Sequence, residues 1–368
     1  STIRIRGTST LNASSDPLIV IDGVPYPQDI NDDFDFNTAT EEDLGALLNI
    51  SPNDIASVEV LKDASATAIW GVQGANGVLV IKTKQGTVGK TRFSFSSKWT
   101  LKEEPNNIPM LSGKEYTSLM QEAIWNSAKY IGLDNPANRY LDMLSSANAI
   151  GDNPDWRYYD EYNQNTYWLD YVRQDALVSD NNFSMSGGGE KATYRLSLGY
   201  MSDDGTTIGT SLKRLNSSLV INYNFSNKLR FGADFSYSQS DRETNWADNV
   251  REVALKKMPN KSPYTIDNQT GAMTDDYFIY HDPVYEGVFS AREDTYKYAA
   301  NYNPVAMVNE ASNSTMQREG KITFRAEYDI LPGFTYKGWA SINMRTTKTR
   351  RFLPQVVTGV VQSSVFSN

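Results

Sequence analysis

The stretch Lys321-Ile322-Thr323-Phe324-Arg325-Ala326-Glu327-Tyr328-Asp329-Ile330 alternates polar and apolar side chains without a break. Successive side chains of a β-strand point to opposite faces, so this pattern predicts a strand with one polar and one apolar face. About seven such segments can be read from the chain. They lie at 91–101, 177–186, 191–201, 214–225, 229–237, 321–330 and 334–344. Their length, about 10–14 residues, suits a tilted strand that crosses a membrane.

The connections between these segments alternate in length. Tight turns are expected at 187–190, 226–227 and 332–333, and long polar connections at about 102–176, 202–211 and 241–316. Short turns at one end and long loops at the other are typical of outer-membrane β-barrels. A bacterial barrel has an even number of strands from 8 upward, so these segments would form only part of one. A soluble β-sandwich, with its apolar faces turned inward, is the alternative.

Composition narrows the possible functions. The net charge of the 368-residue chain is -9, whereas a protein that binds nucleic acid needs a basic surface. Cysteine is absent, so disulfides and thiolate metal sites are excluded. Aromatic residues make up 12% of the chain, which argues against a disordered protein. The chain opens at Ser1 and shows no signal peptide, so we expect a mature product or a piece of a longer one.

The first 86 residues follow a different pattern, with short elements instead of long strands. Strands are predicted at 18–22, 58–61 and 78–83, and a short helix at 63–70. Gly71, Gly74 and Gly77 lie between that helix and a strand, which is the reverse of the dinucleotide-binding order and indicates tight turns. The sequence therefore predicts an α+β domain at 1–86, followed by antiparallel strands over 87–368.

Two motifs in this first domain resemble a known family. They are Pro17-Leu18-Ile19-Val20-Ile21-Asp22-Gly23-Val24-Pro25 and Val58-Glu59-Val60-Leu61-Lys62-Asp63-Ala64-Ser65-Ala66-Thr67-Ala68-Ile69-Trp70-Gly71. Both are similar to the plug domain of TonB-dependent outer-membrane transporters of the SusC/RagA type, nutrient importers of Bacteroidetes. Family members usually carry Tyr at the position of Trp70 and Arg near Gln73, so local contacts of the plug could differ here.

The resemblance implies a transporter rather than an enzyme, in the outer membrane of a bacterial cell and with no cofactor. It implies a plug inside a 22-stranded transmembrane β-barrel, of which this chain holds the plug and the first strands. The implied partners are a SusD-like surface lipoprotein, a TonB complex that supplies energy, and outer-membrane lipid. Two transporter–lipoprotein pairs are expected to associate. The implied cargo is an oligosaccharide, or otherwise a peptide.

Candidate substrate contacts follow the Asp22-Gly23 turn. The resemblance places this segment near the apex of the plug, where aromatic faces and polar groups would meet the cargo. The candidate residues are Tyr26, Gln28, Asp29, Asn31, Asp33, Phe34 and Phe36. A solvated acidic loop is the simpler interpretation, and a Ca²⁺ loop is disfavoured because Phe36 replaces the turn glycine of an EF-hand.

The polar faces of the strands carry charges that should line the interior of a barrel. They are Arg195, Arg214, Arg230, Asp234, Arg325, Glu327 and Asp329. Some could pair with the plug, and breaking such pairs would then form part of plug release. No catalytic or metal site is predicted, because His281 is the only histidine and Glu103 and Glu104 point to opposite sides of a strand. The other functions considered are a secreted carbohydrate-binding β-sandwich or adhesin, and a surface glycosidase.

Overall fold

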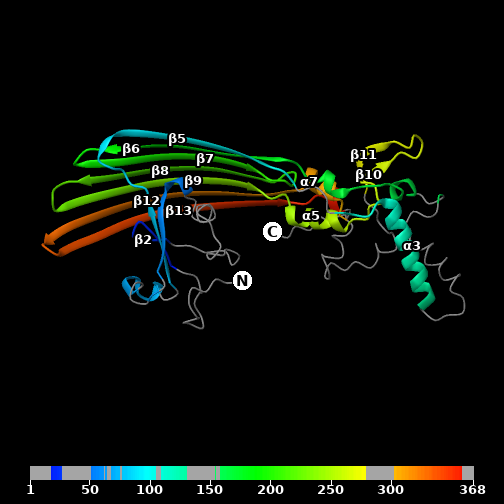
Figure 1. Ribbon diagram of the computed structural model, residues 1–368, viewed down its shortest axis with the longest axis horizontal. Helices are drawn as coiled ribbons and strands as arrows, with labels where there is room; N and C mark the ends of the chain where they lie inside the picture. Colours follow the sequence, from blue (N-terminus) through cyan, green and yellow to red (C-terminus); the bar gives the residue numbers. More distant parts are fainter. Residues whose placement is uncertain are drawn as a thin grey trace, which may run out of the picture.

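A computed structural model of the chain shows a large seven-stranded sheet beside a smaller four-stranded sheet (Figure 1). The structure describes residues 18–26, 51–61, 63, 68–74, 77–104, 109–130, 154, 158–278 and 302–358. The smaller sheet lies beneath the large sheet, toward the end that carries the tight turns, and the helices α3, α5 and α7 gather at the opposite end.

The large sheet consists of β5 (Gly89–Lys102), β6 (Ala176–Gly188), β7 (Ala192–Asp204), β8 (Ser211–Asn224), β9 (Leu229–Glu243), β12 (Ser312–Leu331) and β13 (Phe334–Phe352). Its strand order is β13-β12-β9-β8-β7-β6-β5, with every neighbouring pair antiparallel. Strands that follow one another in this sheet are therefore neighbours throughout. This is the up-and-down arrangement of transmembrane barrels, and it confirms the strands predicted from the alternating segments.

The register of the strands gathers the apolar residues on one face of the sheet. Ile322 in β12 lies opposite Phe235 in β9 and Ile342 in β13. Phe95 in β5 lies opposite Phe183 in β6. A slip by one residue would turn every side chain to the other face, so the alternation in the sequence determines how the strands pair.

The apolar face of the large sheet is uncovered in the described part of the chain. Phe95 is 70% exposed, and Phe324 and Tyr336 are also exposed. In a β-sandwich these side chains would be buried against a second sheet. The polar face instead meets the residues around the smaller sheet, for example where Asp54, directly before one of its strands, pairs with Arg195. The β-sandwich interpretation is therefore wrong for this chain.

The connections agree with the prediction in their alternation but not in all their bounds. Tight turns occupy 189–191, 225–228 and 332–333, and long connections occupy 103–175 and 244–311. The connection after β7 is short, however, and covers only 205–210. β12 begins at Ser312, inside the expected loop 241–316. The prediction missed this start because the first residues of the strand are polar on both faces, so no apolar row marks them.

The smaller sheet has the strand order β2-β1-β4-β3. Its strands are β1 (Leu18–Ile21), β2 (Val24–Pro25), β3 (Ile55–Leu61) and β4 (Val78–Thr83). Val20 and Ile81, on the parallel central strands, are fully buried in its core. In the described part of the predicted helix 63–70 the chain forms a 3-10 helix, η2 (Ala68–Gly74), and a second, η1 (Pro52–Asp54), precedes β3. We call this unit, with the following residues to Gln85, the small domain.

The end of the large sheet opposite the tight turns carries a separate packed unit. Its elements are η4 (Asp160–Tyr162), η5 (Trp168–Tyr171), α5 (Ala247–Lys256), β10 (Tyr264–Ile266), β11 (Met273–Tyr277), α7 (Pro304–Glu310) and α8 (Gln355–Thr358). We call these elements the loop module. The sequence predicted polar loops here, but Val250, Ala306 and Val357 are buried in a common apolar core. The longer helix α3 (Gly113–Tyr130) extends away from the sheet (Figure 1).

One buried asparagine joins the parts of the loop module. The Asn303 side chain caps α7 by accepting hydrogen bonds from the backbone N–H groups of Val305 and Ala306, at 3.0 and 3.3 Å. Its amide nitrogen donates to the backbone oxygens of Pro263 and Phe278, at 2.7 and 3.2 Å. The same side chain thus satisfies the helix terminus and fixes both ends of the β10–β11 hairpin. None of the described helices is both long and apolar enough to cross a membrane.

Candidate functional site

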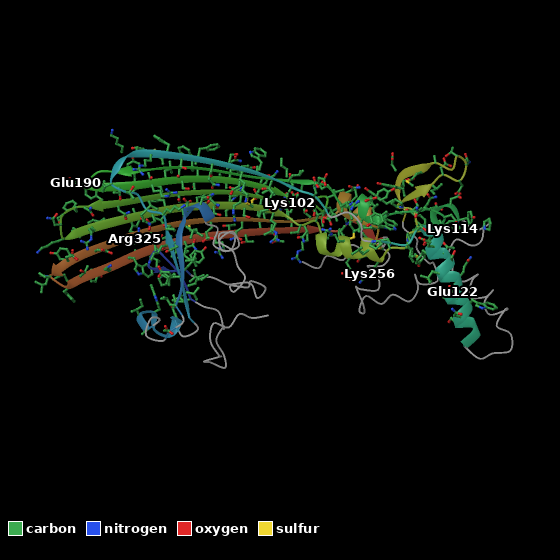
Figure 2. The ribbon with its side chains drawn as sticks, viewed as in Figure 1. Lys102, Lys114, Glu122, Glu190, Lys256 and Arg325 are labelled. Carbon is green, nitrogen blue, oxygen red and sulfur yellow. The ribbon has the colours of Figure 1, made fainter. Side chains whose placement is uncertain are left out.

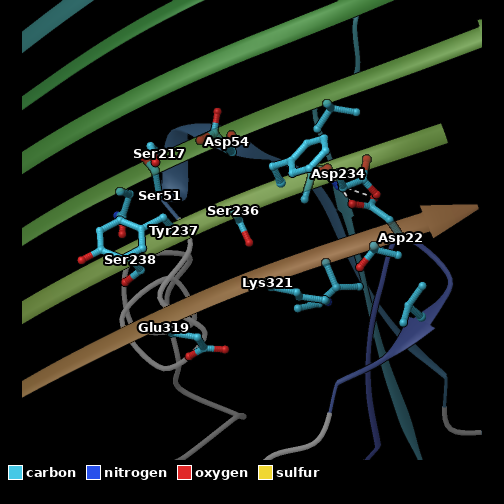
Figure 3. A pocket seen from close by; sticks show the side chains of 18 of the residues that line it. Asp22, Ser51, Asp54, Ser217, Asp234, Ser236, Tyr237, Ser238, Glu319 and Lys321 are labelled. Carbon is cyan, nitrogen blue, oxygen red and sulfur yellow. Dashed lines mark hydrogen bonds between the residues drawn. The ribbon is translucent and has the colours of Figure 1, made fainter. Parts of the chain in front are cut away.

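The candidate site is the interface between the small domain and the polar face of the large sheet. We call the large sheet the wall. Figure 2 shows Arg325 on the side of the large sheet that faces the small domain. A cavity of about 100 Å³ lies between the two surfaces. Its lining includes Asp22, Asp54, Asp234, Ser238, Glu319 and Lys321, and the large sheet contributes residues from β8, β9 and β12 (Figure 3).

Tyr26 forms a buried contact between the small domain and the wall. Its backbone N–H donates to the oxygen of Ile19 at 2.9 Å, which ties it to the core strand β1. Its side chain is 4% exposed, and its hydroxyl donates to Oε1 of Glu319 at 2.5 Å. Burial, followed by the hydrogen bond to Glu319, raises the pKa of Tyr26, so the hydroxyl keeps its proton and remains a donor.

The acceptor of this hydroxyl, the Glu319 carboxylate, is held in place by other residues of the wall. Glu319 and Arg345 lie directly opposite each other on β12 and β13. Arg345 donates to Oε2 of Glu319 from Nε and Nη2, at 3.1 and 3.0 Å, and Nη2 also donates to the Tyr26 hydroxyl oxygen at 3.0 Å. Asn343 donates to Oε1 of Glu319 at 3.1 Å. The Lys321 ammonium lies 5.2 Å from the centre of the Tyr26 ring, within the range of a cation–π contact.

A second group of contacts joins the small domain to β6, β7 and β8. Arg195 in β7 forms an ion pair with Asp54 at 3.1 Å, and the two side chains are only 13% and 10% exposed. The Ser51 hydroxyl donates to Oδ1 of Asn182 at 3.1 Å. Gln85 accepts a hydrogen bond from Asn222, also at 3.1 Å. Each contact links residues far apart in the sequence, so together they fix the small domain against the wall.

The turn between β1 and β2 places a carboxylate at this interface. Asp22 has a φ of 49°, and Gly23 follows it with a φ of 84°. Both values lie in the left-handed region, which Asp tolerates better than most residues and Gly adopts freely. The Asp22 carboxylate accepts hydrogen bonds from the Thr83 backbone N–H and hydroxyl, at 2.9 and 2.7 Å. Arg325, which donates to Asp234 at 2.8 Å, approaches the Asp22 backbone oxygen at 3.5 Å.

The structure locates only part of the predicted site. Of the candidate substrate contacts, Tyr26 alone lies in the described residues, and there its hydroxyl is bonded to the wall. The others, Gln28, Asp29, Asn31, Asp33, Phe34 and Phe36, lie outside the described residues, as does His281.

The charges predicted for the interior divide into two groups. Arg195 and Arg325 contact the small domain. Arg230 instead pairs with Glu327 and Asp329 within the wall, at 3.2 and 2.7 Å. Glu319 and Arg345 were missed, because the strands were predicted to begin at Lys321 and to end at Met344. Continuing the alternation by two residues before Lys321 and by one residue after Met344 would have placed both on the polar face.

The polar and charged groups at the interface engage one another. Each acidic side chain at the interface is engaged by a basic or hydroxyl group, as Glu319 is by Arg345 and Asp54 by Arg195. Within the described ranges, no three His, Asp or Glu side chains gather closely enough to hold a metal ion. The arrangement is that of two polar surfaces with a small cavity between them.

Sequence comparison matches the model of the TonB-dependent Receptor Plug Domain to residues 1–78. The TonB-dependent receptor SusC of Bacteroides thetaiotaomicron is 34% identical over 218 residues, which cover 59% of this chain and 18% of SusC. The TonB-dependent receptor P3 of Formosa agariphila is 26% identical over 355 residues, covering 96% of this chain and 29% of that receptor. The chain thus spans less than a third of the length of these curated relatives.

Structure comparison gives the same fold. The RagAB peptide importer in its "closed-closed" state matches 96% of this chain and 37% of its own, with a TM-score of 0.64 and 24% identity. The "open-open" state matches 95% of this chain and 36% of its own, with a TM-score of 0.62 and 23% identity. The small domain is therefore a plug and the large sheet part of a barrel wall. In sequence and fold the chain is similar to TonB-dependent outer-membrane transporters of the SusC/RagA type.

Proposed function

We propose that this chain acts in the TonB-energised import of a nutrient across the outer membrane. In this function the plug closes the barrel at rest, and TonB, acting from the periplasm, displaces it. The observation that carries the proposal is the position of the plug, which is bonded to the polar face of the wall through Tyr26 and Asp54. A plug held by polar contacts can be moved without exposing an apolar core to water.

A SusD-like surface lipoprotein is the proposed partner on the cell surface, and two transporter–lipoprotein pairs form the proposed assembly. The relatedness to SusC and the fold shared with the RagAB importer support this partner. The loop module lies at the end of the sheet opposite the tight turns, where long extracellular loops are found in barrels (Figure 1). It gives such a lipoprotein a folded surface to meet.

The proposed cargo is an oligosaccharide, with a peptide as the second candidate. The oligosaccharide is favoured by the commoner cargo of the resembled family, whereas the structural neighbour RagAB is described as a peptide importer. The proposed contacts are Tyr26, Gln28, Asp29, Asn31, Asp33, Phe34 and Phe36. Aromatic faces and carboxylates of this kind would bind the faces and hydroxyls of sugar rings.

Uptake by cells tests the proposal. The full-length transporter and its lipoprotein are expressed in cells that lack other transporters of this type, and labelled oligosaccharides and peptides are offered in turn. Uptake of one class, abolished by deletion of TonB and by removal of the lipoprotein, is the expected result. Uptake that persists without TonB would contradict active import, and uptake of peptides alone would replace the proposed cargo.

The proposed contacts can be tested in the same cells. Asp33→Asn and Phe34→Ala should each weaken binding of the imported class, by tenfold or more for the aromatic ring. Asp35→Asn is the matched control, because it removes a charge from the same acidic stretch at a position not assigned to substrate. Equal loss in all three variants would indicate a general effect of charge or folding, and the assignment of individual contacts would then be wrong.

A further inference from the structure

We propose that Tyr26, Glu319 and Arg345 form a latch that holds the plug against the wall and sets how easily the plug is displaced. The proposal rests on the proposed function, because a latch has a role only if the plug moves. In the closed state it assigns Tyr26 a positioning role in place of the substrate contact proposed above, because the side chain is buried and bonded to Glu319. It also adds Glu319 and Arg345, which were not among the residues predicted from the sequence.

The latch joins rigid parts on both sides. On the plug, Tyr26 is hydrogen-bonded through its backbone to Ile19 in the buried core strand. On the wall, Glu319 and Arg345 are directly paired on neighbouring strands and hydrogen-bonded twice to each other. A bond between two rigid bodies resists their separation more than a bond between flexible loops, because little movement can be absorbed on either side.

The wall half of the latch exists without the plug. Glu319 accepts hydrogen bonds from Arg345 and Asn343, so it stays satisfied when Tyr26 leaves. Loss of one partner from a buried charge is strongly destabilising, but here the charge keeps its partners in both states. The cost of opening the latch is therefore limited to the contacts made by Tyr26 itself, and Tyr26 can bind again to an acceptor that is already in place.

The position of the cavity makes the latch reversible. Tyr26, Glu319 and Lys321 all line the cavity of about 100 Å³ between plug and wall. Water admitted through this space can satisfy the Tyr26 hydroxyl once it separates from Glu319. The neutral hydroxyl also leaves no unpaired charge on the plug. A latch built from an ion pair across the interface would be harder to open, since it would expose a buried charge on each side.

The test measures plug displacement without substrate or TonB. The full-length transporter is inserted into planar bilayers, and the opening of conducting pores is recorded as urea is increased. Tyr26→Phe removes one hydroxyl and leaves the pair of Glu319 and Arg345 intact. We expect pores to open about tenfold more often at a given urea concentration, equivalent to about 1.4 kcal/mol. Glu319→Gln should have an effect in the same direction.

The matched control is Tyr194→Phe. The Tyr194 hydroxyl forms a 2.6 Å hydrogen bond with Thr91, between strands of the large sheet, so the same substitution breaks a bond within the barrel. Opening should be unchanged in this variant. The double variant Tyr26→Phe, Glu319→Gln should open no more readily than the stronger single variant, because Glu319→Gln weakens, by removing the acceptor's charge, the same bond that Tyr26→Phe removes. Correct assembly is checked by heat-modifiable migration in electrophoresis.

Unchanged opening in both Tyr26→Phe and Glu319→Gln would overturn the latch. A loss of substrate affinity in Tyr26→Phe with unchanged opening would also overturn it, and would make Tyr26 a direct substrate contact. The bilayer measurement does not depend on import, so it still tests the latch if the uptake experiment fails. If Glu319→Gln does not assemble, Arg345→Lys replaces it, since lysine cannot donate to both Glu319 and Tyr26 in the geometry of the guanidinium.

Discussion

The plug–wall interface and the loop module are both buried, but different forces hold them together. Across the interface, the contacts are hydrogen bonds and ion pairs, such as Tyr26 with Glu319 and Arg195 with Asp54. The loop module closes on an apolar core in which Val250 and Ala306 are fully buried. The plug–wall interface is a contact between two separately folded units, whereas the loop module has a hydrophobic core of its own.

The difference indicates which region is built to move. A hydrogen bond contributes only about 0.5–1.5 kcal/mol net, because water can replace the partner that is lost. Exposing apolar surface costs about 25 cal/mol for each Å², with no such replacement. In the proposed function the plug would therefore leave its wall by breaking polar contacts, while the loop module keeps its shape. The following predictions test this contrast, beginning with the largest expected effect.

A disulfide between plug and wall should abolish transport. A Cβ atom built on Gly199 in β7 would lie 3.7 Å from the Ser51 hydroxyl oxygen, so the pair Ser51→Cys, Gly199→Cys is close enough to be bridged with small adjustments. The chain contains no other cysteine. We expect uptake to fall to background in the oxidised protein and to return when dithiothreitol is added. Labelled substrate accumulated by cells is the measurement.

The single variants Ser51→Cys and Gly199→Cys are the controls, and each should transport under both conditions. Gly199→Cys also reports whether the side chain of Asn182, whose Oδ1 would lie 2.8 Å from the new Cβ, can move aside. Full uptake by cells whose transporter is shown to carry the disulfide would mean that the plug does not separate from β7 during transport. In that case the interface would be as fixed as the loop module, and the contrast would fail.

Arg195→Gln should loosen the plug by about 3 kcal/mol, because Asp54 would stay largely buried without its cation. Hydrogen exchange of the β3 amides is the measurement, and it should become faster. Lys82→Gln is the matched control within the plug. It breaks the Lys82–Glu59 pair, whose side chains are 56% and 48% exposed, and such pairs contribute about 0–1 kcal/mol. Equal effects of the two substitutions would show that burial does not strengthen the plug–wall pair.

Met307→Ala should destabilise the loop module by about 2–5 kcal/mol, because Met307 lies in its core and truncation leaves a cavity. Thermal unfolding followed by tryptophan fluorescence would show this, since Trp168 is part of the same core. Leu255→Ala, at an exposed position of α5, should have little effect. Pore opening in urea should stay unchanged in both variants. Easier opening with Met307→Ala would show that the two regions are coupled.

The strands could be predicted from the sequence because the lipid imposes a strict period of two. Outward positions such as Phe324 and Ile342 must be apolar, and the polar face alternates with them. The upper parts of β12 and β13 were missed for the same reason. The apolar row of β13 ends at Met344 and that of β12 begins at Ile322, so the strands were bounded there, and Glu319 and Arg345 were left out although they continue the polar rows of the same strands.

The loop module could not be assembled from the sequence because its core joins distant segments. Trp168, Val250 and Met307 are separated by long stretches, and of the three only Met307 lies in an apolar run of four residues, Val305–Val308. A local signal was present at α7, where Asn303 precedes Pro304 in the order of a capping residue and a first helical proline. The plug fold, by contrast, could be predicted because its motifs are continuous.

The smallest predicted effect concerns the charge buried in the loop module. Lys261 is 4% exposed, and its ammonium lies 5.4 and 5.1 Å from the ring centres of Tyr162 and Phe278. Burial lowers the pKa of Lys261 from 10.5 to about 8. Burial also lowers the pKa of Lys257, with a further contribution from the charge of Lys261. Below pH 8, the folded module thus holds a charge that its interior disfavours.

The sign of the pH dependence follows from proton binding. Between about pH 8 and 10.5 the unfolded chain binds more protons at Lys261 than the folded chain does, so the stability of the module rises with pH in this window. Lys261→Met removes the titrating group. At pH 7 we expect it to stabilise the module by roughly 1–2 kcal/mol, less than the full cost of the lowered pKa because the cation–π contacts are lost too.

The measurement is the unfolding temperature of the module between pH 7 and 10, with Lys256→Met as the control. The side chain of Lys256 is 70% exposed, so its removal should change neither the stability at pH 7 nor the slope. The advantage of Lys261→Met should shrink as the pH rises, because the natural lysine then loses its charge. If the stability gained by Lys261→Met stays constant with pH, the charged ammonium is not destabilised between the rings of Tyr162 and Phe278. The loop module would then be held partly by electrostatic attraction, as the plug–wall interface is.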